Sequence, residues 1–184
     1  MPISLRVKLL KETITTSELL PKVSAALQEI LGLREPTKIV LEEWADGQLT
    51  GSAPRTISTQ SPLVSFRIFD DPDDIAYLHC YLRGVHEPGD EATPQALVDV
   101  GSGRKPLDFA LAAAVAAAVA RENNSDVVDD MPFFSEAMDQ SGDLFIESVR
   151  VKRPFEDYRD AAQAFSEALY GVRRWRETPQ KGFW

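Results

Sequence analysis

The chain has 184 residues, of which 43% are hydrophobic, and carries a formal net charge of −9 at pH 7. Because a chain of this length buries roughly two-thirds of its unfolded surface, one hydrophobic core can stabilise it without disulfides or metals. The only cysteine, Cys80, excludes an internal disulfide, and the longest apolar run, Phe109 to Ala120, is shorter than the ~20 residues that cross a bilayer. Together with an N-terminus that lacks the apolar block of a signal peptide, these features predict a soluble, cytoplasmic protein without membrane contact.

The N-terminal part of the chain predicts a strand followed by an amphipathic helix. Ile3 to Leu10 alternate apolar and polar residues, which is the period of a half-buried strand. Thr15 and Glu18 have the spacing of a capping box, and Gly32 stands where the left-handed C-terminal residue of a helix is expected. Between them, one helical face carries the apolar residues Leu19, Leu20, Val23, Leu27, Ile30 and Leu31.

The next segment predicts three strands and a long connection. Lys38 to Trp44 and Leu63 to Phe69 are typical of strands, and the polar segment Ala45 to Pro62 between them is long for a compact domain, which favours a mobile or functional loop. The sequence Asp70-Asp71-Pro72-Asp73-Asp74 has turn chemistry and predicts a hairpin between the second of these strands and Ile75 to Arg83. Apolar residues on both faces of this last strand indicate a central position in the sheet.

The C-terminal half predicts two further helices. Ala96 to Val100 is typical of a short strand, and Phe109 to Ala120 is apolar on nearly all sides, so it should be the buried central helix of a layered domain. A short strand is expected at 126–130, and Asp143 to Val151 is interpreted as another strand. Pro154 should start a last helix that Gly171 closes.

The resulting order, β-α-β-β-β-β-α-β-β-α, predicts an α+β fold. We expect a mixed or mostly antiparallel sheet of about five to seven strands, roughly three main helices, and burial of the alanine-rich central helix. No internal repeat or linker divides the chain, so residues 1–171 should form a single domain followed by a basic C-terminal tail at 172–184.

No set of residues with convincing catalytic spacing occurs in the sequence. His79 lies in a predicted strand and His86 in an acidic loop, and this spacing matches no helical zinc signature. No serine stands in a Gly-x-Ser-x-Gly elbow. We therefore expect no catalytic residue, metal or cofactor, with a divalent ion held by the acidic loop around His86 as the alternative.

The loop Val98-Asp99-Val100-Gly101-Ser102-Gly103, which opens the central helix, resembles the first glycine motif of S-adenosylmethionine-dependent methyltransferases. The resemblance implies close backbone approach to a nucleotide-like cofactor whose ribose a later acid, Asp129 or Asp130, would bind; Lys105 stands where a third glycine is usual. Independently of that family, the free N–H groups of a helix N-terminus could bind an anion with the help of Gly101, Ser102, Gly103, Arg104 and Lys105. The alternative is a solvent-exposed turn that only connects strand and helix.

Acidic residues are concentrated in the middle of the chain. Residues 35–147 hold 21 acids and 7 bases, whereas both ends carry net positive charge. Such a field repels nucleic acid and speeds encounter with basic proteins. The candidate partner-binding residues are the clustered acids and the aromatic residues that could anchor an interface, namely Asp70, Asp71, Asp73, Asp74, Asp126, Asp129, Asp130, Trp44, Phe133 and Phe134. Charge that only keeps the protein soluble is the alternative interpretation.

These observations favour a small cytoplasmic protein that acts by binding another protein. The most concrete version is a bacterial immunity-type inhibitor that neutralises a basic toxin such as a nuclease. A nucleotide- or anion-binding enzyme or sensor that uses Gly101 to Lys105 is the second hypothesis. A structural subunit of a larger assembly is the third.

Overall fold

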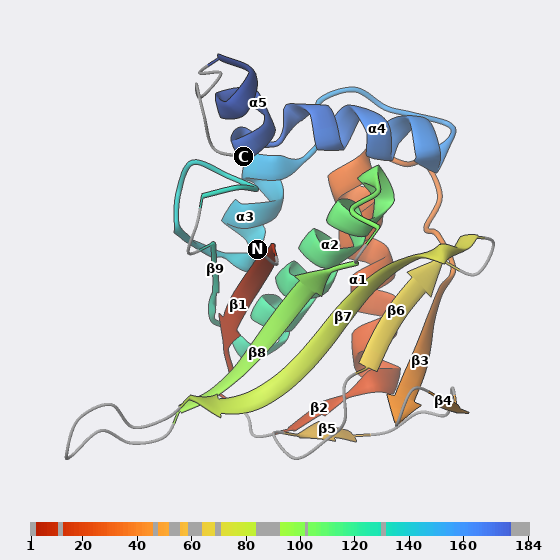
Figure 1. Cartoon of the computed structure of the whole chain (residues 1–184), viewed down its shortest axis with the longest axis vertical. Helices are drawn as coiled ribbons and strands as arrows, with labels where there is room; N and C mark the ends of the chain where they lie inside the picture. Colours follow the sequence, from red (N-terminus) through yellow and green to blue (C-terminus); the bar gives the residue numbers. More distant parts are fainter. Residues whose placement is uncertain are drawn as a thin grey trace.

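The computed structural model describes residues 3–10, 13–45, 48–51, 56–58, 64–68, 71–83, 93–101, 103–129 and 132–177, with the backbone alone described at 42–45, 48–51, 71–74, 79–83, 93 and 175–177. An eight-stranded antiparallel sheet has the order β10-β9-β1-β8-β7-β6-β3-β4 (Figure 1), and a second sheet pairs β2 with β5. The strands are β1 (Ser4–Lys8), β2 (Thr13–Thr15), β3 (Ile39–Ala45), β4 (Gln48–Gly51), β5 (Thr56–Ser58), β6 (Val64–Ile68), β7 (Asp71–Arg83), β8 (Thr93–Val100), β9 (Asp126–Val128) and β10 (Asp139–Ser141). The helices are α1 (Thr16–Leu31), α2 (Pro106–Asn123), α3 (Gly142–Val149), α4 (Tyr158–Ala168) and α5 (Tyr170–Glu177).

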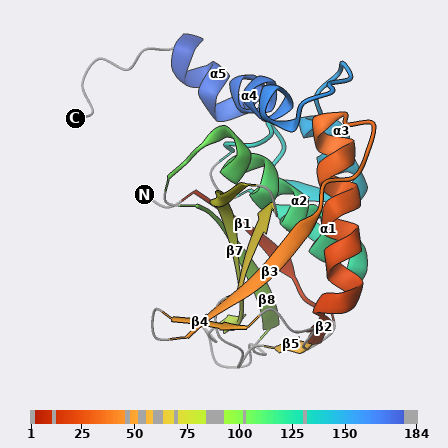
Figure 2. The same ribbon diagram turned by 90° about the vertical axis from the view of Figure 1, so that its right-hand side faces the viewer.

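The helices gather on one side of the large sheet, as Figure 2 shows. In β1, Leu5 and Val7 are buried in the core, whereas Arg6 and Lys8 alternate onto the opposite face. The antiparallel register places Leu5 beside Val98 of β8, which is also fully buried. The core therefore lies between the helices and one face of the sheet.

Helix α2 is the centre of the fold. It contacts α1, α3 and α4 as well as β1, β7 and β8. Its alanines at 110, 112–114, 116–118 and 120 are fully buried, and their small side chains let these neighbours pack closely. The predicted burial of the alanine-rich helix is confirmed, as are the α+β class and the mostly antiparallel sheet.

Most strand predictions are also confirmed. The predicted hairpin is formed by β6 and β7, in which Val64 pairs with Leu78 in antiparallel register, but Asp71 to Asp74, predicted as part of its turn, belong to β7. The polar segment predicted as a loop at 45–62 contains two short strands, because β4 pairs with β3 and β5 pairs with β2. Part of that long connection is therefore held by backbone pairing.

Helix α3 (Gly142–Val149) occupies most of the segment from Asp143 to Val151, so the strand prediction there is wrong. The hydroxyl of Ser141 caps the helix by accepting a hydrogen bond from the backbone N–H of Leu144 at 3.4 Å. The buried side of the helix follows the i, i+3, i+4, i+7 spacing, with Gly142, Phe145, Ile146 and Val149. In so short a segment the same apolar residues fit both the helical period and the strand period. The N-cap at Ser141 is the feature that selects the helix.

Several helix boundaries differ from expectation. Thr15 precedes α1, but its side chain makes no capping hydrogen bond, whereas Gly32 ends that helix with the predicted left-handed backbone at φ 63°. The last predicted helix begins at Tyr158, after Asp157 accepts hydrogen bonds from two backbone N–H groups of its first turn. Helix α5 covers part of the segment predicted as a tail. Among the described residues, no helix combines the length and apolar character that a membrane crossing requires.

Candidate protein-interaction surface

Asp129, which the sequence placed in an exposed acidic cluster, is a buried structural residue. It is only 3% exposed. Its Oδ2 accepts hydrogen bonds from the backbone N–H groups of Phe133 at 2.8 Å, Phe134 at 2.7 Å and Ser135 at 3.4 Å. A carboxylate that satisfies several amide groups stabilises the loop that follows β9. Asp129 therefore does not belong to the exposed acidic surface that was predicted.

Phe134 is also in the core, at 2% exposure, and Phe133 is half-buried. Their rings form a cluster with Phe109 of α2, in which the Phe109 and Phe133 centroids are 5.4 Å apart and those of Phe133 and Phe134 are 5.7 Å apart. The backbone N–H of Gly171 donates to the carbonyl of Phe133 at 2.8 Å. This cluster holds the loop against α2 and α5, so Phe134 is no exposed anchor for a partner.

Three of the other predicted site residues, Asp70, Ser102 and Asp130, lie outside the described residues. The backbone alone is described for Asp71, Asp73 and Asp74 of β7 and Trp44 of β3. Strands β1 and β8 separate β7 from β9, which carries Asp126. The described backbone therefore places Asp71, Asp73 and Asp74 on a strand that is not adjacent to the strand of Asp126.

Gly101 is buried and closely packed where β8 leads toward α2. Asp108, which is 1% exposed, accepts hydrogen bonds from the backbone N–H groups of Ile75 at 2.7 Å and Lys105 at 2.9 Å. This internal carboxylate occupies the N-terminus of α2, where an external anion was predicted to bind. A Cβ on Gly101 would lie 2.5 Å from the carbonyl oxygen of Ile75, so glycine is required there for packing. Gly103 and Arg104 are exposed.

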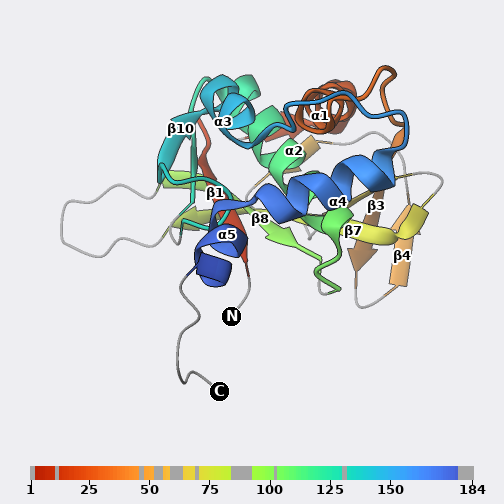
Figure 3. The same cartoon turned by 90° about the horizontal axis from the view of Figure 1, so that it is seen from above.

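Exposed acids and two exposed hydrophobic side chains occur in β9, β10, α3 and the residues just before β10. We define the β10-end surface by its exposed residues Asp126, Glu136, Met138, Asp139, Asp143, Leu144 and Glu147. Strand β10 pairs with β9, and α3 contacts both strands (Figure 3). Met138 and Leu144 are 49% and 62% exposed, and they are two of the three large exposed hydrophobic residues in the described part of the chain.

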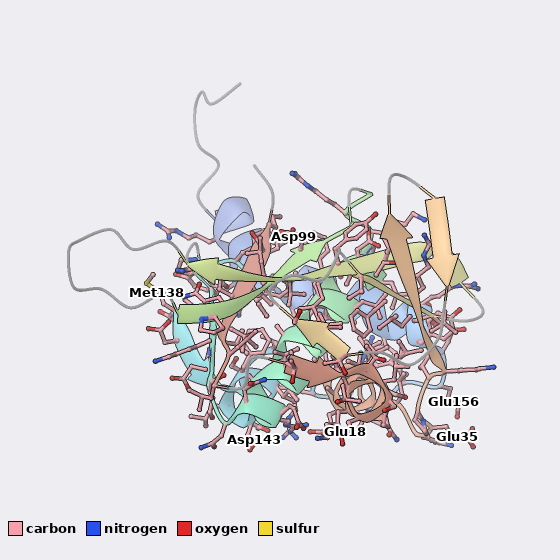
Figure 4. The ribbon with its side chains drawn as sticks, turned by 90° about the horizontal axis from the view of Figure 1, so that it is seen from below. Glu18, Glu35, Asp99, Met138, Asp143 and Glu156 are labelled. Carbon is pink, nitrogen blue, oxygen red and sulfur yellow. The ribbon has the colours of Figure 1, made fainter. Side chains whose placement is uncertain are left out.

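The packing of α3 explains why this surface carries an apolar group among acids. Phe145, Ile146 and Val149 fix the buried side of the helix, so that Asp143 and Leu144 face solvent. Figure 4 shows Met138 at the edge of the molecule beside the strands and Asp143 on the helical side. Exposed apolar side chains rimmed by polar residues are typical of interaction sites when they form a contiguous patch, whereas single ones are common on any protein surface.

A hollow of about 360 Å³ lies between the C-terminal end of α2 and the start of α3. We call it the α2–α3 hollow. It shares Asp126 and Asp143 with the β10-end surface. A Cβ on Gly142 would lie 2.9 Å from the carbonyl oxygen of Ala117, so the close approach of α3 to α2 requires glycine at this wall. The lining residues are Ala120, Arg121, Asn124, Ser125, Asp126, Ser141, Gly142 and Asp143.

The one basic side chain in the lining of this hollow is already paired. The guanidinium of Arg121 donates hydrogen bonds to Glu29 at 2.9 Å and to Asp143 at 2.7 Å, which ties α1, α2 and α3 together. The hydrogen bond to Glu29, followed by that to Asp143, holds the pKa of Arg121 above its ordinary value, although partial burial acts in the opposite direction. Arg121 is therefore a charged structural group.

The other acids of the β10-end surface keep it negative. Glu147 pairs with Arg150 at 2.9 Å, but both side chains are largely exposed, so water screens the pair. Within the described part of the chain, no ion pair engages Asp126, Glu136 or Asp139. A positively charged group approaching this surface therefore meets uncompensated carboxylates.

A second cavity, of about 340 Å³, lies between the α1–β3 connection and the start of α4. Its lining includes both positively and negatively charged residues, and Arg34 pairs with Glu156 at 3.4 Å in an exposed position. This cavity therefore does not complement a partner of one charge. In the described residues no group of histidine, cysteine and acidic side chains is arranged to hold a metal ion.

Comparisons with protein-family models, with curated proteins and with solved structures found no match. Asp126 was predicted from the sequence, whereas Met138 and Leu144 were not. Leu144 lies in the segment that was interpreted as a strand. The signal that could have found Leu144 is Ser141, a good N-cap residue, followed by apolar residues at helical spacing.

Proposed function

We propose that this chain is a cytoplasmic binding protein that contacts a basic protein partner through the β10-end surface. The observation that carries the proposal is the exposure of Met138 and Leu144 among carboxylates such as Asp126 and Asp139. Apolar groups that become buried on binding supply affinity, while surrounding charge speeds encounter and selects the sign of the partner. The same charge disfavours nucleic acid as a ligand.

The most concrete form of the proposal is a bacterial immunity-type inhibitor of a basic toxin such as a nuclease. A nuclease attracts its phosphate substrate with a positive surface. A small protein with a net charge of −9 competes for that surface electrostatically and then blocks it sterically. Inhibition by occlusion requires a stable surface and does not require a catalytic group.

The test is affinity capture from the native cell with the wild-type chain and two matched variants. Leu144→Ser removes an apolar side chain from the β10-end surface, and Leu10→Ser removes one of nearly equal exposure, 61% against 62%, from another part of the chain. We expect the wild type and the Leu10 variant to retain a stoichiometric basic protein that the Leu144 variant loses. Equal capture by all three proteins would remove the β10-end surface from the proposal.

The inhibitor form has its own test. The captured partner is produced in a bacterial host with and without this chain, and growth is followed after induction. We expect the partner to arrest growth when it is alone and growth to recover when the chain is present. A partner that is harmless on its own would contradict the immunity-type form while leaving a binding function in place.

A further inference from the structure

The α2–α3 hollow presents several groups that can accept hydrogen bonds. Asp126 contributes an exposed carboxylate, Asn124 an amide oxygen and Ser141 its hydroxyl. The hollow also lies at the C-terminal end of α2, where the helix dipole is negative. Carboxylate, dipole and neutral acceptors together favour a cationic group that carries several N–H donors.

The hydroxyl of Ser125 is an independent observation at this place. Its Oγ is buried and has no hydrogen-bond partner in the part of the chain that the structure describes. Its backbone N–H donates to the carbonyl of Ala120 at 3.0 Å, which fixes Ser125 in the wall of the hollow. Because buried hydroxyl groups are normally satisfied, an unpartnered one at a hollow points to a ligand that supplies the missing hydrogen bond.

The positive charge of Arg121 does not neutralise the whole hollow. Its guanidinium is directed to Glu29 and Asp143, at 2.9 and 2.7 Å. Asp126, on the β9 side of the same hollow, makes no ion pair within the described residues. One carboxylate therefore remains uncompensated, and it lies next to Ser125 in the chain.

We propose that the α2–α3 hollow receives an arginine side chain of the basic partner, an inference that rests on the proposed function. Arginine fits this site better than lysine because a planar guanidinium directs five N–H donors to separate acceptors, whereas an ammonium is a compact charge with three. The adjoining Leu144 is exposed and covers apolar surface of the partner around the inserted side chain.

The experiment titrates the full-length, isotope-labelled chain with N-acetyl-arginine N-methylamide and follows backbone amide shifts by NMR. We expect saturable shifts at 124–126 and 141–143, with a dissociation constant on the order of millimolar for so small a probe. Asp126→Asn should weaken binding about fivefold, because one exposed charge contact is lost. Ser125→Ala should weaken the binding of the arginine derivative less than Asp126→Asn does. The matching citrulline derivative carries no charge and should cause no amide shifts.

Glu18→Gln is the control, because Glu18 is an exposed acid on α1 outside the hollow. It should leave the affinity unchanged, and a thermal melt of each variant confirms that it is folded. Shifts spread over all exposed acids, or equal affinities for Asp126→Asn and Glu18→Gln, would overturn the inference. Stronger shifts with the lysine derivative would overturn the choice of arginine. None of these titrations requires the natural partner, so their failure is distinguishable from the failure of the proposed function.

Discussion

The carboxylate of Asp129 stabilises the loop between β9 and β10 by accepting hydrogen bonds from Phe133, Phe134 and Ser135. Asp129→Ala removes the acceptor and leaves buried amide groups unsatisfied. We expect the free energy of unfolding to fall by about 2 to 4 kcal/mol, since each hydrogen bond to a charged group contributes about 1.5 to 3 kcal/mol and water replaces part of the loss. Urea unfolding followed by circular dichroism measures the change.

The matched control for this variant is Asp126→Ala, which removes the same side chain three residues earlier in an exposed position. Its effect should stay within about 0.5 kcal/mol, as is usual for surface substitutions. If both variants unfold at the same urea concentration, the hydrogen bonds of Asp129 do not stabilise the loop. The pair therefore separates a structural carboxylate from an interaction carboxylate within one short segment.

Gly171 lies where helix α5 meets the ring of Phe133. A Cβ at this position would be 2.4 Å from Cδ2 and 3.1 Å from Cα of Phe133, and Phe133 cannot retreat because its ring stacks on Phe109. Alanine normally stabilises a helix over glycine by about 1 kcal/mol. Here overpacking costs about 1 to 3 kcal/mol, so we expect Gly171→Ala to lower the stability of the protein.

Differential scanning calorimetry tests the sign of that change. Gly103→Ala is the control, because a Cβ there meets its nearest atom, Oδ2 of Asp108, at an ordinary 3.4 Å. The midpoint temperature should fall for Gly171→Ala and stay nearly constant for Gly103→Ala. A rise for Gly171→Ala would show that helix propensity outweighs the contact with Phe133.

At the level of elements, the packing of α2 makes a similar prediction. Ala116 is fully buried in a helix that α1, α3, α4 and the sheet surround. Ala116→Leu should therefore cost about 1 to 3 kcal/mol by overpacking. Ala25→Leu introduces the same change on the exposed side of α1 and should leave the thermal melt almost unchanged. Equal melts for the two variants would contradict the central position of α2.

The connection from Gly101 to Lys105 should not bind phosphate. The Asp108 carboxylate already accepts hydrogen bonds from Lys105 and Ile75 at the start of α2, and it repels a second anion. We expect millimolar phosphate or a nucleotide to leave the melting temperature of the wild type unchanged, since only a ligand selective for the folded state raises it. An increase that Arg104→Ala abolishes would restore the anion-binding hypothesis.

Elements with a strong hydrophobic period or a defined turn could be predicted from the sequence, whereas helix α3 could not. Only one secondary-structure assignment fits the alternating residues of β1. The same holds for the apolar face of α1 and for the uniformly apolar α2. Helix α3 has eight residues, and its apolar positions also suit a strand. Its capping by Ser141 and its packing on α2 are the interactions that select the helix.

The candidate site was predictable only in part, for a related reason. The sequence does not distinguish Asp126 from Asp129, because both are acids at or next to the ends of one short strand. Their roles differ because the backbone N–H groups of Phe133 and Phe134 donate hydrogen bonds to the carboxylate of Asp129. Burial of a charge depends on such donors, which local residue patterns do not reveal.

At the scale of the whole molecule, strand order decides where an interface can form. Strands β10 and β4 are the two ends of the large sheet, and α3 extends the helical layer to the β10 end. The exposed Met138 lies at that end in Figure 4, and Glu35 and Glu156 lie at the other. The two ends therefore carry acids in different settings, one with apolar neighbours and one beside the cavity that also contains Arg34.

This asymmetry gives the last prediction, which concerns the rates of binding to the captured basic partner. Asp126→Lys with Asp139→Lys should slow association about tenfold at low salt, and the effect should shrink as ionic strength rises past about 0.15 M. Leu144→Ala should act on dissociation instead, with a loss of about 2 kcal/mol if it anchors the interface, because anchors are desolvated while steering charges stay hydrated. Surface plasmon resonance over a salt series measures both rates.

The matched control reverses Glu35 and Glu156 to lysine, which changes the net charge equally but at the other end of the sheet. Beyond a Debye length of about 8 Å at physiological salt, those charges are screened from the β10-end surface, so their reversal should alter association much less. If both double reversals slow association equally, only the net charge steers the partner and the β10-end surface has no special role. If Leu144→Ala leaves dissociation unchanged, the partner is held elsewhere, because an apolar group that becomes buried on binding cannot be lost without cost.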